Sequence, residues 1–244
     1  MLKKKMFIHQ SIPYYFNWNK MHHKEKYSQI VSNRDELNKL KEHFQKVYEG
    51  AIPNNLFNSK EFPRVSQFKI KGLKPAFTRS FSKKLIRTDR IQYHDSNSKL
   101  PQYAKKVFEN FRENNFGSIP GHEPILKNIL IKDKDAVAIE VPIWSKKENK
   151  VITGHIDLIQ VENDVVKVID YKPEGNFLIS LPQVAMYGLL FKTKLSIRNV
   201  KCISFNKQGA WEYDPNILKE DVKEYLISHH IDKRPWEIFL YNYQ

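Results

Sequence analysis

Two carboxylates and a lysine lie on neighbouring apolar segments in the second half of the chain. Asp157 lies in the run Gly-His-Ile-Asp-Leu-Ile (154–159), and Asp170 lies in Val-Ile-Asp-Tyr-Lys-Pro (168–173), which also holds Lys172. Residues two apart on a strand point to the same face, so Asp170 and Lys172 share one. Burying two carboxylates side by side is unfavourable unless a positive charge neutralises them. A divalent cation would provide it, because carboxylate oxygens are ligands that Mg²⁺ prefers.

An ammonium beside such a site can orient an attacking water and stabilise phosphorane-like charge. Hydrolysis of a phosphodiester needs little more than a metal, a positioned water and charge stabilisation. An isolated Asp-x-Lys is common, and surface salt bridges on a hairpin are the alternative explanation. The complete pattern favours a catalytic site, because it adds further polar residues to the Asp-x-Lys. Among them is a helical pair at i and i+4, whose side chains share one face of the helix. In chain order, the pattern is Gly154-x-x-Asp157, Asp170-x-Lys172 and Gln183-x-x-x-Tyr187.

The elements around these residues predict an α/β fold with a central mixed sheet flanked by helices. Turn residues at 162–164 separate two apolar runs and predict a hairpin. A capping-box-like start with Ser32 and Asp35 begins the first helix, and Pro182 suits the first turn of a later one. The predicted helices are 34–49, 102–113, 121–130, 181–193 and 215–229. The predicted strands are 65–70, 136–141, 151–161, 165–171, 200–205 and 210–213.

The pattern resembles the RecB-type branch of the PD-(D/E)XK nucleases, which includes lambda-type exonucleases and CRISPR-associated exonucleases. The resemblance covers residues 120–206 and looks closest to archaeal members with Gly-His-Ile-Asp and Asp-Tyr-Lys-Pro signatures. It implies a restriction-endonuclease-like core at 119–244. Residues 1–118 are then expected to form a basic, partly helical N-terminal extension that binds substrate.

The resemblance also implies roles for individual residues. Asp157 and Asp170 would be metal ligands together with the backbone carbonyl of Tyr171, and Lys172 would be the catalytic lysine. The metal would be Mg²⁺ or Mn²⁺. The helical pair Gln183 and Tyr187 would contact substrate or support the site.

Four further residues are candidates around this site. The family's first motif, on the helix before the sheet, falls on His122 or Glu123; we favour His122 as a ligand, with helix capping as the alternative. Glu140 would be an outer-sphere ligand or a partner of Lys172, or else a strand-surface carboxylate. His155 lies two residues before Asp157 and is expected to face the same way.

The charge of the chain predicts a polyanionic partner. The net charge is +14, and residues 1–130 hold 25 of the 41 basic residues but only 11 of the 27 acidic ones. Phosphates attract such a surface and release counterions on binding. A solvated basic face that maintains solubility is the alternative. The predicted nucleic-acid contacts lie in the densest basic run, at Lys74, Arg79, Lys83, Lys84, Arg87 and Arg90.

The single cysteine, Cys202, excludes an internal disulfide and a four-cysteine iron–sulfur cluster, which the CRISPR-associated relatives carry. We expect a reducing, cytoplasmic compartment. No apolar stretch approaches the length of a membrane span, so no membrane partner is expected.

The sequence therefore predicts a Mg²⁺- or Mn²⁺-dependent deoxyribonuclease, an exonuclease or end-processing enzyme in DNA repair, replication or mobile-element biology. Its expected partner is DNA, single- or double-stranded, with ends. Endonuclease activity, RNA as substrate and the oligomeric state stay open. Two alternatives remain: an inactive nucleic-acid-binding protein with a nuclease-like fold, and a basic structural protein whose hairpin acids form salt bridges. Only the nuclease requires the metal for turnover.

Overall fold

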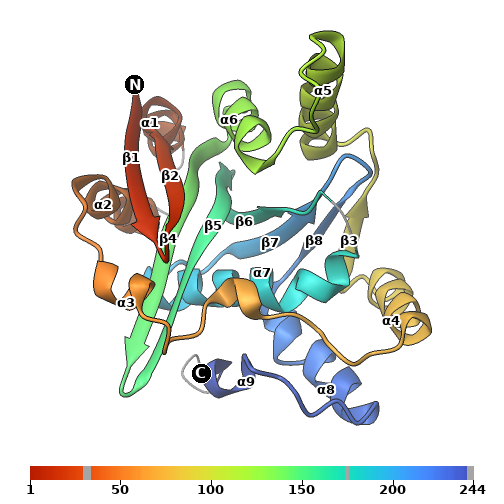
Figure 1. The fold of residues 1–244 in the computed structure, drawn as a ribbon. Coiled ribbons are helices and arrows are strands. Elements are labelled where there is room, and N and C mark those ends of the chain that lie inside the picture. The colour runs from red at the N-terminus through yellow and green to blue at the C-terminus, as the bar shows by residue number, and fades with distance from the viewer. Residues whose placement is uncertain (30–33, 174–175, 241–244) are drawn as a thin grey trace.

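An eight-stranded mixed sheet forms the centre of the computed structural model, which describes residues 1–29, 34–173 and 176–240 (Figure 1). The strand order is β1-β2-β4-β5-β6-β7-β8-β3. Neighbouring strands are antiparallel except for the parallel pair β6 and β7. The strands are β1 (Leu2–His9), β2 (Ile12–Asn19), β3 (Ile91–His94), β4 (Ala136–Lys147), β5 (Lys150–Glu162), β6 (Val165–Tyr171), β7 (Val200–Phe205) and β8 (Ala210–Tyr213).

Helices cover both faces of this sheet, so the fold is the α/β arrangement that the sequence predicts. The α-helices are α1 (Lys20–Gln29), α2 (Arg34–Glu49), α3 (Asn54–Asn58), α4 (Pro75–Arg87), α5 (Lys99–Glu113), α6 (His122–Lys132), α7 (Phe177–Lys194), α8 (Asp221–Ser228) and α9 (Glu237–Leu240). Short 3₁₀ helices are η1 (Val65–Gln67) and η2 (Pro215–Leu218). Within the described ranges, no helix is long and apolar enough to cross a membrane.

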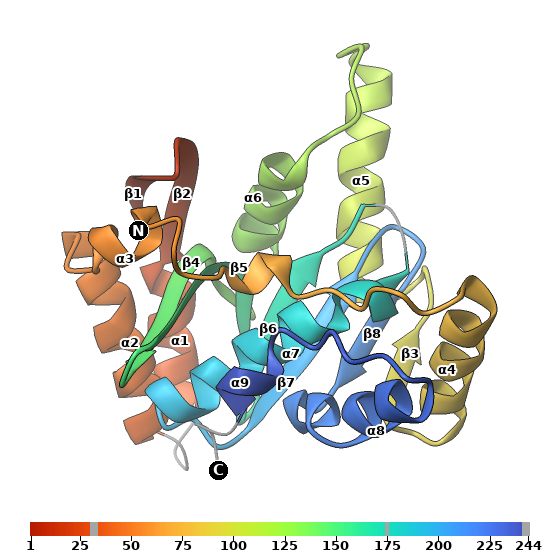
Figure 2. The ribbon, with the colours of Figure 1, turned by 60° about the horizontal axis from the view of Figure 1, so that its bottom comes forward.

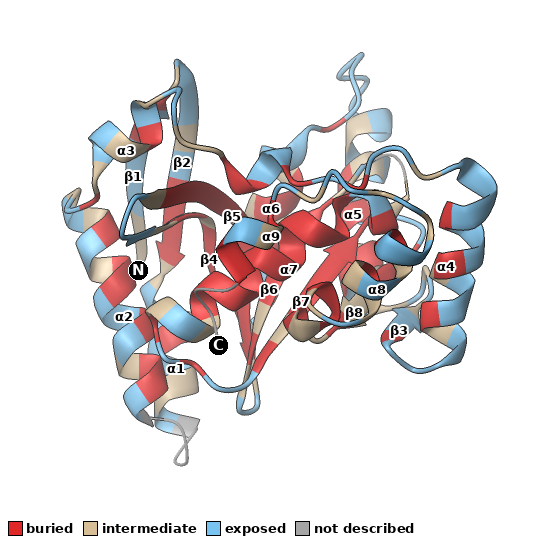
Figure 3. Ribbon diagram, turned by 90° about the horizontal axis from the view of Figure 1, so that it is seen from below, coloured by how far each residue is buried: buried red, intermediate tan, exposed pale blue. Residues whose placement is uncertain are grey.

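Two apolar clusters divide the core between the faces of the sheet. The larger one surrounds α7, which is buried along most of its length (Figure 3). The smaller one joins α5 and α6 to the opposite face. Along β6, Val168 belongs to the larger cluster and Ile169 to the smaller one, as strand alternation requires. Asp170 therefore faces α7.

The N-terminal region differs from the expected extension, because it completes the central sheet at both edges. The hairpin β1–β2 joins β4 at one edge, and β3 joins β8 at the other. The segment between α3 and α4 crosses α7 (Figure 2). It is fixed there by a bridge from Arg64 to Thr153 and by a hydrogen bond from Ile70 N to Ile179 O of 3.0 Å.

Most predicted elements from residue 136 onward are confirmed, and β6, β7 and β8 keep their expected bounds. Helix α2 spans the predicted 34–49, although Ser32 of its expected cap lies outside the described residues. The predicted strand at 65–70 is wrong, since η1 occupies its first half. Helix α7 begins at Phe177 with an Asn176 cap, so Pro182 lies inside it rather than in its first turn. The predicted helix 215–229 is divided into η2 and α8.

Candidate active site

Asp157 and Asp170 lie where the paired stretch of β5 and β6 ends. The last pair of the ladder on this side is Leu158 with Ile169, and the two aspartates follow directly. The Asp157 carboxylate accepts a hydrogen bond from Tyr171 N, with Oδ2 to N at 2.9 Å. This contact holds the first acid against the backbone of the strand that carries the second.

Asp170, Lys172 and Gln183 form a closed group of polar contacts. Lys172 Nζ lies 2.5 Å from Asp170 Oδ2 and donates to Gln183 Oε1 at 3.1 Å. Gln183 Nε2 donates to Asp170 Oδ1 at 3.2 Å. The Asp170 side chain is only 2% exposed, whereas that of Lys172 is 23% exposed. Gln183 on α7 therefore fixes the lysine beside the acid, while the ammonium keeps access to solvent.

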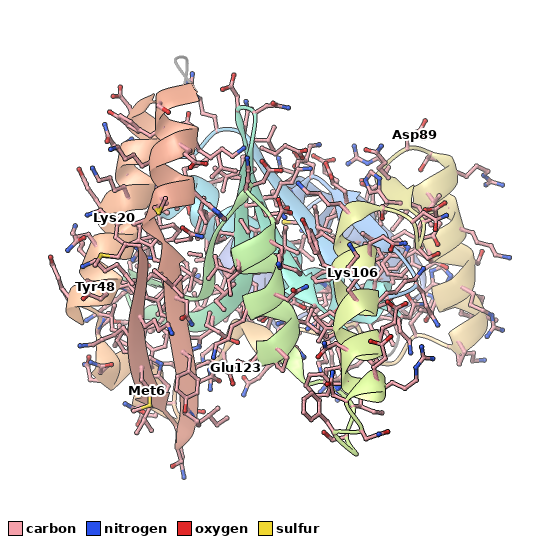
Figure 4. The ribbon with its side chains drawn as sticks, turned by 90° about the horizontal axis from the view of Figure 1, so that it is seen from above. Met6, Lys20, Tyr48, Asp89, Lys106 and Glu123 are labelled. Carbon is pink, nitrogen blue, oxygen red and sulfur yellow. The ribbon has the colours of Figure 1, made fainter. Side chains whose placement is uncertain are left out.

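His122, at the start of α6, approaches the same place from the other face of the sheet. Its Nδ1 lies 3.4 Å from Asp157 Oδ2, and its ring meets the Tyr171 ring edge-on with centroids 5.2 Å apart. The interaction with Asp157 raises the pKa of His122. Glu123 instead points outward on α6 and pairs with Lys127 (Figure 4). Of the two sequence candidates, the structure brings His122 to the aspartates.

Glu140 on β4 lies opposite Asp157. Its neighbours Ile139 and Val141 pair with the residues on either side of Asp157. Glu140 has φ of 51°, and among the described residues it is the one non-glycine inside a strand with positive φ. That conformation is strained for a residue with a side chain, and such strain gathers at functional sites.

Two of the carboxylates, Glu140 and Asp170, hold their protons more tightly than free carboxyl groups do. Burial, and then the charge of Asp157, raises the pKa of both Glu140 and Asp170. Burial opposes the charge of Lys172, yet the carboxylates outweigh it and raise the pKa of the ammonium. Perturbed acids that share one place with a lysine are typical of functional sites.

The donor set fits a hard divalent cation in its chemistry. Asp170 Oδ2 is buried with the Lys172 ammonium as its charged neighbour, and the acids around it supply the oxygen donors that Mg²⁺ and Mn²⁺ take. No group of three His, Cys, Asp or Glu side chains stands in a preformed metal-binding arrangement in the described part of the chain. Lys172 and His122 contact the acids instead. The residues of the site therefore match a divalent cation in their charge and donor atoms, but they do not form a preformed coordination shell.

His155 belongs to a separate buried network. Its Nε2 lies 2.9 Å from His9 Nδ1, and its Nδ1 lies 3.2 Å from Arg64 Nη2. Arg64 also donates to Tyr14 OH at 2.6 Å, and the Tyr14 ring stacks on His155. Burial holds the pKa of His155 well below its usual range. These contacts tie β2 and η1 to β5, a structural role that sequence reasoning missed because the partners are far apart in the chain.

Tyr187 on α7 is buried against β5 at Gly154. A Cβ added at Gly154 would lie 2.5 Å from Tyr187 Cε1. Burial, followed by the charges of Asp170 and Asp157, raises the pKa of the Tyr187 phenol well above its usual value. Gly154 thus allows α7 to pack close to the strand that carries Asp157.

We expect Gly154→Ala to lower the free energy of unfolding by about 1–3 kcal/mol, the usual consequence of overpacking a core. Denaturant unfolding measures this loss. Gly121→Ala is the comparison, because nothing lies within 4 Å of a Cβ at that position and only the change of the α6 N-cap, a smaller cost, is expected there. If the two variants are equally stable, Tyr187 does not constrain this strand.

The basic residues predicted to bind nucleic acid gather on α4 and its flanks. Helix α4 packs near β3, at an edge three strand spacings from β6, or about 14 Å. Lys83, Lys84 and Arg87 are exposed there. Arg90 is already engaged by Asp221, at 2.7 Å, and by Glu220. The α4 surface therefore lies beside the site rather than around it.

No protein-family model and no curated protein sequence matches the chain. Among solved structures, it is similar to one titled "Crystal structure of SSO0001", with 18% sequence identity and a TM-score of 0.29. That match covers 62% of this chain and 86% of the other. A likeness this weak carries no conclusion about activity.

Proposed function

We propose that the protein is a metal-dependent nuclease of the PD-(D/E)XK type that hydrolyses phosphodiester bonds in DNA. The observation that supports it best is the meeting of Asp157, Asp170 and Lys172 at one end of the β5–β6 ladder. A salt-bridge hairpin on the surface would leave these acids solvated. Asp170 is instead buried, and a residue from another element holds its lysine.

Each residue of the site has a separate role in this proposal. Asp157, Asp170 and the Tyr171 carbonyl would hold Mg²⁺ or Mn²⁺, with His122 and Glu140 beside them. The bound metal supplies Lewis-acid stabilisation of the phosphate and lowers the pKa of a coordinated water. Lys172 places a positive charge where negative charge develops on the phosphoryl oxygens. Gln183 keeps that charge in position through its contact with Nζ.

Metal removal tests the proposal directly. We expect wild-type protein to cut end-labelled linear DNA in Mg²⁺ or Mn²⁺, to stop in EDTA, and to recover when excess metal is restored. Closed circular and linear DNA, each single- and double-stranded, separate an exonuclease or end-processing enzyme from an endonuclease. Binding of every substrate without cleavage under all metal conditions would instead identify the inactive nucleic-acid-binding alternative.

The exposed basic residues of α4 are proposed to contact DNA phosphates and so to strengthen DNA binding without regard to sequence. Replacing Lys83, Lys84 and Arg87 by Ala should weaken binding and flatten its salt dependence. Each lost phosphate contact should reduce the log–log slope by about 0.9 on duplex, or about 0.7 on a single strand. Fluorescence anisotropy over a salt series measures this slope. An unchanged slope would place α4 away from the DNA.

A further inference from the structure

An open cavity of about 520 Å³ lies at the C-terminal end of α5, on the face of the sheet that α5 and α6 cover. Its walls come from the C-terminal half of α5, the segment 115–120 and Lys207 in the turn after β7. This volume is within the range of about 300–1,000 Å³ that ligand pockets occupy.

The cavity combines aromatic rings with exposed apolar surface. Phe108 and Phe111 line it, and the Phe116 ring packs edge-on against Phe111 with centroids 5.0 Å apart. Phe116 is 57% exposed and Ile119 is 75% exposed. Apolar side chains gathered in this way on a surface indicate a binding site.

Positive charge borders the same rings. Arg112 and Lys207 line the cavity, and Lys207 Nζ lies 4.7 Å from the centroid of the Phe108 ring. Glu109 is the one acidic residue among the lining side chains. Aromatic faces beside cationic side chains are what single-stranded nucleic acids require, because bases stack on the rings and phosphates contact the charges.

The cavity is joined to the candidate site by two short stretches of chain. The segment that ends at Pro120 leads through Gly121 into His122, which contacts Asp157. Lys172 N donates to Phe205 O at 2.8 Å, and Lys207 follows two residues after Phe205. His122 and the cavity lie on the same face of the sheet, so a strand bound at Asp157 can extend along residues 117–122 into the cavity.

The geometry points to a stacking site for unpaired nucleotides in this cavity, which holds the strand adjacent to the bond being cut. The inference rests on the proposed nuclease function and specifies its substrate as a nucleic acid with a single-stranded segment at the site. Phe111, which lines the cavity and is partly buried against the smaller core cluster, stacks on the base with the part of its ring that remains accessible, and Arg112 and Lys207 contact the flanking phosphates. The exposed apolar residues around them screen the stacked base from water.

Binding can be measured apart from cleavage with labelled oligothymidylate and a blunt duplex in Ca²⁺. We expect Phe111→Leu, which keeps apolar bulk but removes the ring, to weaken single-strand binding about fivefold or more and to leave the duplex within about twofold. Arg112→Gln should lower the single-strand salt slope by about 0.7. Tyr15→Leu and Lys24→Ala are matched controls on β2 and α1, and both should bind as wild type does.

The outcomes separate this inference from the proposed function. Wild-type affinity of Phe111→Leu for single strands, or equal weakening on both substrates, would overturn the stacking site even if the protein cuts DNA. A selective loss on single strands in a protein that never cuts would support the stacking site and reject the nuclease. If Phe111→Leu abolishes self-association but not DNA binding, the cavity binds a second copy and the inference is wrong.

Discussion

The Asp170→Asn protein is expected to lose both cleavage and metal-dependent stabilisation. Burial and the neighbouring Asp157 carboxylate both disfavour the negative charge of Asp170. A cation bound beside Asp170 would offset this cost and should therefore stabilise the native state of the wild type. At a metal concentration 100 times Kd, the gain in unfolding free energy should be about 2.7 kcal/mol. Asparagine keeps the shape and removes the charge. We expect the gain to vanish and the cleavage rate to fall about 10³-fold or more, because the metal contributes several kcal/mol to the transition state.

Thermal unfolding with and without Mn²⁺, together with calorimetric titration, measures the stabilisation. Asp89→Asn is a suitable control, since Asp89 is exposed at the end of α4 and asparagine tolerates its positive φ (Figure 4). It should keep both the metal response and the activity. Equal Mn²⁺ affinity in wild type and Asp170→Asn would remove Asp170 from the ligand set.

Local sequence signals predicted the second half of the sheet because its strands are continuous apolar runs with clear turns. The hairpin of β5 and β6 follows from Glu162-Asn163-Asp164, and Asn163 indeed adopts a positive φ. The hairpin β1–β2 has no such signal. Its turn places Gln10 and Ser11 at positive φ, where the usual residues are Asn and Gly. Edge strands also depend on pairing with distant β4 and β8, which local periodicity does not reveal.

Within the candidate site, strand periodicity predicted the shared face of Asp170 and Lys172 but not the surroundings of Asp157. Ile156 and Ile159 both pack in the larger core cluster, whereas strict alternation would separate them. The alternation therefore shifts at Asp157, and residues two apart there need not face together. For this reason His155 enters the network of His9 and Arg64 instead of the candidate site.

The choice between His122 and Glu123 depended on how α6 is rotated against the sheet. Both residues occupy the first turn, and sequence alone leaves that rotation undetermined. The apolar residues of α6 settle it by packing on the smaller core cluster, which brings His122 to Asp157. The conformation of Glu140 could not be predicted either. Its backbone has a positive φ inside β4, a conformation that a glycine in the sequence would usually indicate, and no glycine stands there.

Lys172→Ala is expected to separate binding from cleavage. Lys172 Nζ contacts Asp170 and Gln183 but supplies no metal-binding atom, so its removal leaves the carboxylates of the site in place. The rate of cleavage in Mg²⁺ should fall by about 10²–10³-fold, the effect of losing one preorganised electrostatic group at a transition state. DNA affinity in Ca²⁺ should stay within a few-fold of wild type, because the basic surfaces are unchanged. Single-turnover cleavage and fluorescence anisotropy on the same substrate measure the two effects.

The exposed Lys134→Ala is the matched control, since it removes the same charge away from the site and should leave both quantities unchanged. Lys172→Arg provides a second comparison, because it keeps the charge but replaces a compact ammonium with a planar fork that cannot reproduce the contacts to Asp170 and Gln183. It should recover part of the rate. A Lys172→Ala protein that cuts at the wild-type rate would disprove the role of this lysine and return Asp157 and Asp170 to the salt-bridge explanation. Loss of DNA binding together with the rate would instead place Lys172 among the substrate-binding residues.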